Sequence, residues 1–174
     1  MEAAARGLLG CHLVAGEVRL RLTEVEAYGG PEDSASHARH GRTPRNAPMW
    51  GPPGRLYLYL CYGMHWMVNV VTGPEGQASA VLVRGAEGVE GLEVVLARRG
   101  RTRPGKDLLN GPGKVAQALG LRGPCPGLDL LDPDSPLRLE PGEAPLACEA
   151  SPRIGIAFAE PADQARPWRF VRKG

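Results

Sequence analysis

The sequence predicts an α+β fold in a single domain that covers residues 1–174. Apolar and polar residues alternate with the period of strands within 11–28 and 55–86. By contrast, 89–100 and 107–121 carry the pattern and the end signals of helices. A chain of this length can bury a core and needs no second domain. We therefore expect one unit that combines a sheet with helices.

The first elements are a helix and a hairpin. Residues 2–9 have a helical pattern, and 11–20 predict a hairpin that turns at Gly16. Apolar residues at even positions from Val18 to Leu22 then alternate with charged residues, as in a strand with one buried face.

The same strand continues with polar side chains at the even, inward positions. Glu24, Glu26 and Tyr28 follow Leu22 with the same parity. Either the strand bulges after Leu22, or its core face runs into a cavity where carboxylates are needed. We favour the cavity, because burial of a carboxylate without a partner or a task costs much free energy.

A long loop and a meander follow. Residues 29–54 are rich in Gly, Pro, Ser and Arg and far exceed the usual connection of about 4–6 residues. Long loops on a rigid scaffold are usually functional. The strand-like runs 55–63, 64–73 and 78–86 predict a three-stranded meander. Gly63 marks a tight turn between the first two runs.

Two helices and two closing strands complete the chain. Residues 89–100 predict a helix that Gly100 ends, and 107–121 predict a second helix. Asn110 is the candidate cap of the second helix, and Pro112 stands near its first turn. The remaining segments are a connection with at most short strands at 122–151 and strands at 152–159 and 166–172.

Composition argues against a membrane protein. Apolar residues make up 43% of the chain, and no apolar run approaches the roughly 20 residues of a membrane span. We find no basic and apolar leader at the N-terminus. We therefore expect a soluble cytoplasmic protein.

The cysteines and histidines predict no metal site. His37 and His40 lie three residues apart on the long loop, with no cysteine or carboxylate cluster at zinc-ligand spacing. The cysteines lack CxxC spacing, and we expect them to be buried free thiols. They are Cys11, Cys61, Cys125 and Cys148. We expect no cofactor.

The net charge is only +2, but the charges are unevenly distributed. Residues 126–150 hold six carboxylates against Arg138 alone, which leaves the rest of the chain basic. Basic patches are expected where a protein binds a polyanion, although solvated surface arginines explain either patch alone equally well. The two segments comprise Arg39, Arg42, Arg45 and Arg55, and Arg98, Arg99, Arg101, Arg103 and Lys106.

Six of the nine aromatic residues fall between residues 28 and 66, beside the first basic segment. A core built from strands would spread them along all its elements, and buried tyrosine hydroxyls would need partners. Aromatic rings beside arginines are the means by which proteins stack on nucleobases and hold phosphates. The six are Tyr28, Trp50, Tyr57, Tyr59, Tyr62 and Trp66.

Five long motifs cover nearly the whole chain: TEVEAYGGPEDSASHARHGRTPRN, MWGPPGRLYLYLCYGMHWMVNVVTG, AVLVRGAE, NGPGKVAQALG and PRIGIAFAE. In this order they resemble the alkyladenine (3-methylpurine) DNA glycosylase family. The resemblance implies a base-excision repair enzyme that flips a damaged purine out of duplex DNA and hydrolyses its N-glycosidic bond, leaving an abasic site. It also implies a curved antiparallel sheet with a protruding hairpin and flanking helices. We expect a monomer that binds damaged duplex DNA and therefore associates with a bacterial nucleoid.

The resemblance assigns roles to individual residues. Glu26 matches the glutamate that activates water, and Arg84 matches the arginine that holds this water. Tyr28 and His37 match the rings on one side of the flipped base, and Tyr59 matches the ring on the other side.

Further positions complete the expected site. Asn69 matches the asparagine whose side-chain amine discourages guanine, and Tyr62 matches the tyrosine that intercalates into the duplex. Glu24 is then a second carboxylate with a structural role. Candidate phosphate ligands are Arg39, Arg42, Arg45 and Lys114, the last at a glycine-flanked helix start.

The chemistry of the residues is consistent with hydrolysis. Cleavage of a C1′–N bond passes through an oxocarbenium-like sugar, for which one well-placed carboxylate suffices. Glu24 and Glu26 on one strand face project in parallel and cannot flank a sugar as acid and base. The first lysine, Lys106, is far from Glu26 in sequence, which favours water as the nucleophile and a monofunctional enzyme.

Two other interpretations stay open. A non-catalytic nucleic-acid binder is opposed by Glu26, because a bare carboxylate beside phosphates weakens binding. A small-molecule hydrolase or transferase-type domain has no use for stacking rings beside two arginine patches. Trp50 stands where the family motif has phenylalanine, so the preferred lesion among 3-methyladenine, 7-methylguanine, hypoxanthine and ethenoadenine is left open.

Overall fold

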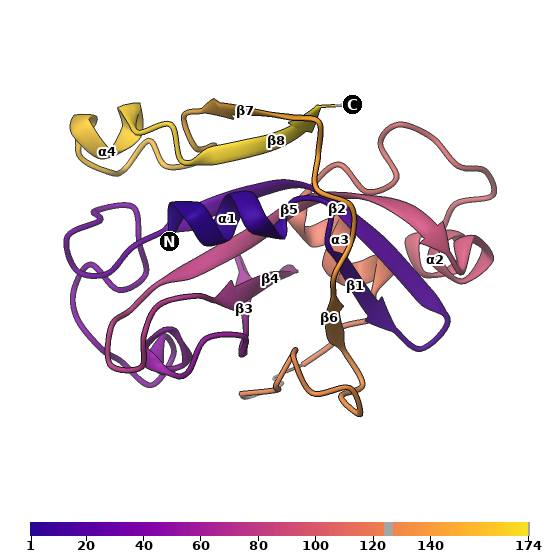
Figure 1. The fold of residues 1–174 in the computed structure, drawn as a ribbon, viewed down its shortest axis with the longest axis horizontal. Coiled ribbons are helices and arrows are strands. Elements are labelled where there is room, and N and C mark those ends of the chain that lie inside the picture. Colours follow the sequence, from indigo (N-terminus) through magenta and orange to yellow (C-terminus); the bar gives the residue numbers. More distant parts are fainter. Residues whose placement is uncertain (124–126, 174) are drawn as a thin grey trace.

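The computed structural model describes residues 1–123 and 127–173, and it confirms the α+β fold (Figure 1). The helices of this part of the chain are α1 (Glu2–Leu8), the 3-10 helix η1 (Ala47–Trp50), α2 (Leu92–Arg99), α3 (Pro112–Ala118) and α4 (Pro161–Ala165). The strands are β1 (His12–Ala15), β2 (Val18–Tyr28), β3 (Leu56–Cys61), β4 (His65–Val71), β5 (Ala80–Glu90), β6 (Arg138–Glu140), β7 (Ala147–Ser151) and β8 (Arg169–Lys173).

The described strands form one eight-stranded sheet with antiparallel pairing. Its order is β3-β4-β5-β2-β1-β6, and the hairpin β7–β8 joins it through β2. One edge of β2 pairs with β5 along most of its length, while the other edge pairs first with β1 and then with β8. The sheet therefore forks at β2 and curls into a half-barrel (Figure 1).

The core lies between the sheet and the helices. α1 packs on β2, and α3 packs on β4 and β5 with α2 beside it. The apolar side chains at the centre have no exposed surface, and each contributes about 1.5–3 kcal/mol through burial. They include Leu13, Leu20, Leu22, Leu56 and Phe170.

β2 bulges between Leu22 and Val25. Its register with β5 shifts on both sides of Glu24, as happens where a strand gains an extra residue. Val25 is consequently buried in the same core cluster as Leu22, whereas Glu24 and Glu26 both reach Arg84 on the other face. The prediction that the carboxylates continue the face of Leu22 is wrong. The alternative that the sequence favours less, a bulge after Leu22, is present, and it turns both carboxylates toward Arg84, which lines a cavity.

Two predicted boundaries around the helices differ. The helix predicted from residue 89 begins only at Leu92, because β5 continues to Glu90 as a partner of β2. Asn110 is not the cap of α3, since Gly111 occupies that position. The Asn110 side chain instead accepts a hydrogen bond from the Lys114 ammonium at 2.7 Å.

The predicted strand at 152–159 is also wrong. This segment contains turns and bends but no strand, and Gly155 has a φ of 78° that interrupts an extended backbone. It bonds to the side chains of β2 and of the long loop instead of a neighbouring strand. The cysteines Cys11, Cys61 and Cys148 are half-buried free thiols, not fully buried ones, and Cys125 lies outside the described residues.

The tip of the hairpin β3–β4 is exposed. Tyr62 has a φ of 50°, a left-handed conformation that is uncommon for a residue with a side chain. Its side chain is 87% exposed, and the neighbouring Met64 is 70% exposed. None of the described helices is long and apolar enough to cross a membrane, and the same residues contain no group of three metal-ligating side chains.

Gly91 is a position where the fold requires glycine. Its φ is 72°, and a Cβ there would lie 2.4 Å from the carbonyl oxygen of Glu17. Gly91→Ala should lower the free energy of unfolding by about 2–4 kcal/mol, through backbone strain and this clash. Gly16→Ala is the matched control, because its φ is 60° but nothing lies within 4 Å, and it should cost about 1 kcal/mol. Urea denaturation measures both, and equal losses would contradict the role of the Glu17 contact.

Candidate active site

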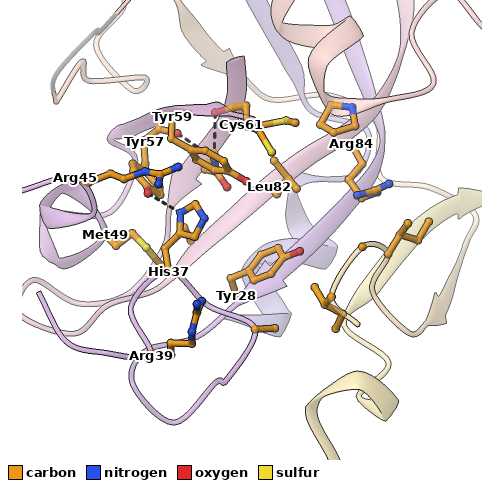
Figure 2. A pocket seen from close by; sticks show the side chains of 18 of the residues that line it. Tyr28, His37, Arg39, Arg45, Met49, Tyr57, Tyr59, Cys61, Leu82 and Arg84 are labelled. Atoms are coloured by element: carbon orange, nitrogen blue, oxygen red, sulfur yellow. Dashed lines mark hydrogen bonds between the residues drawn. The ribbon is translucent and has the colours of Figure 1, made fainter. Parts of the chain in front are cut away.

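A cavity of about 600 Å³ opens beside the long loop, the hairpin β3–β4 and the segment 152–159 (Figure 2). Tyr28 and Arg84 reach it from β2 and β5. It gathers most of the residues that the sequence singled out. Those that line it are Tyr28, His37, Arg39, Arg45, Tyr59, Tyr62, Asn69 and Arg84.

Glu26 lies directly behind the cavity wall and has no exposed surface. Its Oε2 accepts hydrogen bonds from the Tyr28 hydroxyl at 2.8 Å and the Arg84 guanidinium at 3.3 Å. Its Oε1 accepts a hydrogen bond from the backbone N–H of Ile154 at 2.7 Å. A neighbour on β2 and two segments that are distant in sequence therefore hold one carboxylate.

Burial raises the pKa of Glu26 above its ordinary value of 4.5, because a low-polarity environment disfavours the charged form. The charge of Arg84 and the hydrogen bonds from Ile154 and Tyr28 oppose this effect without cancelling it. A carboxylate whose pKa is moved toward neutral pH is a stronger base than an exposed one.

Glu24 fixes the orientation of Arg84. Its Oε1 accepts hydrogen bonds from Arg84 Nε at 3.0 Å and from Arg169 Nε at 2.7 Å. The guanidinium of Arg84 thus spans both carboxylates of β2. This arrangement gives Glu24 a supporting place beside Glu26.

His37, Tyr57 and Tyr59 form one wall of the cavity. The rings of His37 and Tyr59 meet edge to face, with 4.4 Å between their centroids. His37 Nδ1 shares a hydrogen bond of 2.8 Å with the Tyr57 hydroxyl, which holds the loop histidine against β3. Tyr28 lies across the cavity from this wall (Figure 2). This arrangement differs from the one that the resemblance implies, in which His37 lies beside Tyr28 and opposite Tyr59.

The aromatic wall is electrically neutral. Burial lowers the pKa of His37 to about 4, and the nearby charges of Arg45 and Arg39 add to this effect. Burial also raises the pKa of Tyr57 to about 12. The bonded pair of His37 and Tyr57 consequently carries no charge at neutral pH.

Asn69 lies in the floor of the cavity on β4 and is only 3% exposed. Its side-chain amine donates hydrogen bonds to the carbonyl oxygens of Tyr57 at 3.1 Å and Met67 at 3.2 Å. The hairpin backbone thus fixes the rotamer of the side chain that we expected to discriminate against guanine.

The candidate phosphate ligands separate into two groups. Arg39 and Arg45 line the cavity, where their guanidinium groups lie 5.1 Å and 5.8 Å from the ring centroids of Phe158 and Tyr59. Arg42 is exposed on the loop but does not line the cavity, and neither does Lys114 of α3. Both arginines of the cavity also donate to backbone carbonyl oxygens, Arg39 to Ser36 and Arg45 to Leu60. Of the other predicted basic residues, Arg98 and Arg99 donate to carbonyl oxygens, and Arg55 and Arg101 form ion pairs with carboxylates.

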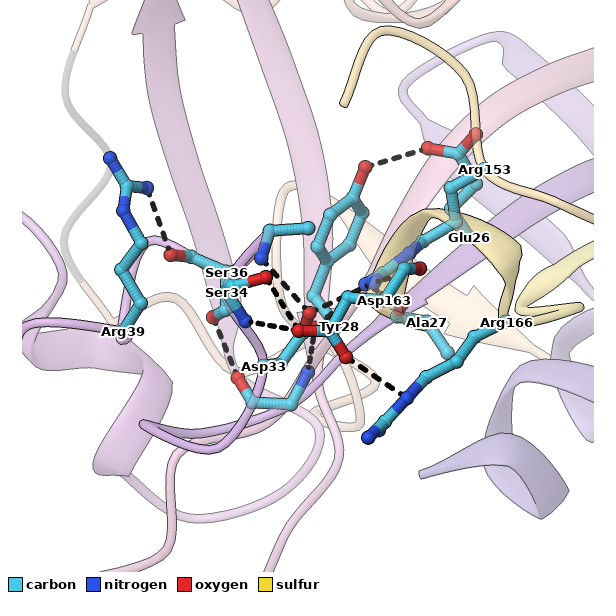
Figure 3. A network of polar contacts seen from close by, with 12 residues as sticks. Glu26, Ala27, Tyr28, Asp33, Ser34, Ser36, Arg39, Arg153, Asp163 and Arg166 are labelled. Carbon is cyan, nitrogen blue, oxygen red and sulfur yellow. Dashed lines mark hydrogen bonds and ion pairs between the residues drawn. The ribbon is translucent and has the colours of Figure 1, made fainter. Parts of the chain in front are cut away.

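Sequence reasoning missed Arg153 and Asp33, which form an ion pair beside the site (Figure 3). Both side chains are fully buried. The run PRIGIAFA contained a signal for Arg153, because an arginine among apolar residues that are expected to be buried needs a charged partner. The partner lies 120 residues away and carries no local pattern.

A model of a known family, described as methylpurine-DNA glycosylase, matches residues 1–174. The chain belongs to this family. Like other methylpurine-DNA glycosylases it is a DNA repair enzyme and a hydrolase of N-glycosyl bonds, and damaged DNA is its substrate.

Relatives support the same assignment. A protein of Nitrosococcus oceani, provisionally named a 3-methyladenine DNA glycosylase, is 53% identical over 172 residues, which cover 98% of this chain and 84% of the relative. A protein of Nocardia farcinica with the same provisional name is 50% identical over 175 residues, which cover 96% and 80%. The DNA-3-methyladenine glycosylase of Arabidopsis thaliana is 47% identical over 164 residues, which cover 94% and 64%.

The neutrality of His37 can be measured by NMR titration. Its imidazole should titrate near pH 4, well below the ordinary value of 6.5. Arg45→Gln should raise this pKa, because it removes a nearby positive charge. Arg42→Gln is the control and should leave it unchanged, since Arg42 is not among the charges that shift it. A midpoint near 6.5 in the wild type would contradict the assigned environment.

Proposed function

We propose that this glycosylase flips an alkylated purine, 3-methyladenine or 7-methylguanine, or a neutral lesion such as hypoxanthine or ethenoadenine, out of duplex DNA. Water activated by Glu26 then hydrolyses the N-glycosidic bond and leaves an abasic site, without a lyase step. The observation that carries this proposal is the buried Glu26 carboxylate, held by three donors behind an aromatic cavity.

Glu26 is the general base in this mechanism. Its raised pKa makes it able to accept a proton from water, and its negative charge stabilises the oxocarbenium-like sugar as the base departs. Arg84 contacts Glu26 and lines the cavity, so it is placed to hold the attacking water between the two. A small shift of Arg84 or Tyr28 opens the carboxylate to a water in the cavity.

The flipped base stacks between Tyr28 and the wall formed by His37 and Tyr59. A neutral His37 suits this role, because a histidinium would repel a purine that alkylation has made cationic. Asn69, fixed at the floor, discourages guanine by placing its amide where an exocyclic amino group would lie. Hydrophobic and aromatic lining with a few polar groups is typical of a specific ligand site.

The surroundings of the cavity suit a single DNA duplex and one protein chain. Tyr62, exposed at the hairpin tip, fills the gap that the flipped nucleotide leaves, as wedge residues of minor-groove proteins do. Arg39 and Arg45 beside it contact phosphates, with Arg42 and Lys114 as outer contacts. A non-catalytic binder would have no need of a desolvated carboxylate, which costs folding free energy.

The role of Glu26 is tested on a labelled duplex with one hypoxanthine and on methylated DNA, with alkali to reveal abasic sites. Glu26→Gln should lower the single-turnover rate by about 10³-fold while lesion binding is retained, because the amide cannot accept the proton of water. Glu24→Gln is the matched control, with a loss of at most about tenfold, since it only loosens Arg84. A larger loss of rate for Glu24→Gln than for Glu26→Gln would make Glu24 the general base. A wild type that binds the lesion duplex but releases no purine would support a non-catalytic binding module.

The proposed wedge role of Tyr62 is tested by two substitutions of its side chain. Tyr62→Ala should weaken binding to a lesion duplex by about 5–150-fold, the value of one lost base stack, without lowering the free energy of unfolding. Tyr62→Phe retains the ring and should bind within about threefold of the wild type. Fluorescence anisotropy at fixed salt measures both, and an unaffected Tyr62→Ala variant would remove the wedge from the mechanism.

A further inference from the structure

The ion pair of Arg153 and Asp33 is the most deeply buried charged cluster beside the site (Figure 3). Arg153 donates from its two terminal nitrogens to the two oxygens of Asp33, at 2.7 Å and 2.8 Å. A buried ion pair is often no more stabilising than apolar side chains of the same volume, because both charges lose their hydration. The pair therefore calls for an explanation other than stability.

The guanidinium of Arg153 lies between two aromatic rings. Its central carbon is 4.7 Å from the ring centroid of Tyr28 and 4.9 Å from that of Trp168. It also donates a hydrogen bond to the carbonyl oxygen of Ala27 at 3.0 Å. A planar cation with several donors can make these contacts at once, whereas an ammonium group cannot.

Two neighbours of Arg153, the ring that its guanidinium contacts and the residue that follows it in the chain, both bond to Glu26. The Tyr28 hydroxyl donates to one carboxylate oxygen, and the N–H of Ile154, the next residue in the chain, donates to the other. Arg153 itself does not line the cavity, so it supports Tyr28 from behind. The position of the carboxylate relative to the cavity thus depends on where the guanidinium anchors the segment 152–159 against β2.

Asp33 connects Arg153 to the start of the long loop. Its carboxylate accepts hydrogen bonds from the backbone N–H groups of Gly29 at 2.9 Å and Ala35 at 3.1 Å, and so it ties the start of the long loop to Arg153. Its negative charge also cancels that of Arg153. A purine cation can then stack on Tyr28 without facing an uncompensated positive charge on the far side of the ring.

We propose that Arg153 is a positioning residue of this glycosylase, which, neutralised by Asp33, holds the Tyr28 hydroxyl and the Ile154 N–H against the two oxygens of Glu26. The inference rests on the proposed role of Glu26 as general base. Arg153 touches neither the water nor the base, and it acts through the two donors that orient the carboxylate.

The test compares Arg153→Lys with Arg166→Lys. Arg166 also faces the ring of Trp168, at 4.4 Å, but does not contact Tyr28 or Glu26, so the same substitution there is a matched control. Arg153→Lys should lower the single-turnover rate about 10–100-fold, with lesion binding within about threefold of the wild type. The acid limb of the pH–rate profile of Arg153→Lys should also move to higher pH, because loosened donors stabilise the Glu26 carboxylate less. Arg166→Lys should match the wild type in its single-turnover rate and in its pH–rate profile.

A second measurement does not depend on catalysis. Carbon-13 NMR of labelled glutamate side chains follows the titration of the Glu26 carboxyl group directly, with Glu26→Gln to assign the signal. In Arg153→Lys this titration should move to higher pH, and in Arg166→Lys it should not. If Arg153→Lys does not fold, Trp168→Leu removes one wall of the stack without a change of charge and should shift the titration in the same direction.

The outcomes distinguish the positioning role of Arg153 from the role of Glu26 as general base. An unchanged Glu26 titration and an unchanged rate profile in a folded Arg153→Lys or Trp168→Leu protein would overturn the positioning role, even if the wild type is an active glycosylase. A wild type that releases no purine from any lesion would instead overturn the role of Glu26, whatever the titration of the variants shows.

Discussion

The buried carboxylate of Glu26 is the constraint on which the rest of the structure depends. Without water, it must obtain its hydrogen bonds from the protein, and it does so from Tyr28 on β2, Arg84 on β5 and the segment after β7. β2 therefore needs β5 on one edge and, on the other, β8 with the segment that precedes it. The fork and the curl of the sheet bring these donors together.

The same constraint accounts for the distribution of charge around the cavity. Inside, His37 and Tyr57 are neutral, and the Arg153 charge is cancelled by Asp33. At the opening, Arg39 and Arg45 donate hydrogen bonds to backbone carbonyl oxygens but pair with no carboxylate of the described residues, so their charges can face a polyanion. A purine cation and a phosphate backbone have opposite charges, and a neutral interior with a basic rim accommodates both.

Burial of Glu26 also links function to stability. Because its pKa is raised in the folded state, the native protein holds this proton more tightly than the unfolded chain does. The stability that this group contributes is present below pH 4.5 and is lost as the pH rises through the folded-state pKa. The enzyme is therefore less stable at neutral pH than an otherwise equal protein without this charge, as is common where activity requires a desolvated group.

The sequence by itself determined most of the strands, most of the helices and most of the residues that gather in the cavity, because alternation, turn glycines and long motifs are local features. Only the tertiary structure decided the bulge at Glu24, the place of His37 beside Tyr59, and the pairing of Arg153 with Asp33. Each of these depends on a partner elsewhere in the chain: Gly85 of β5, Tyr57 of β3, or a residue 120 positions away. Periodicity reports which face of its own element a side chain occupies, but it carries no information about the distant group that the side chain will meet.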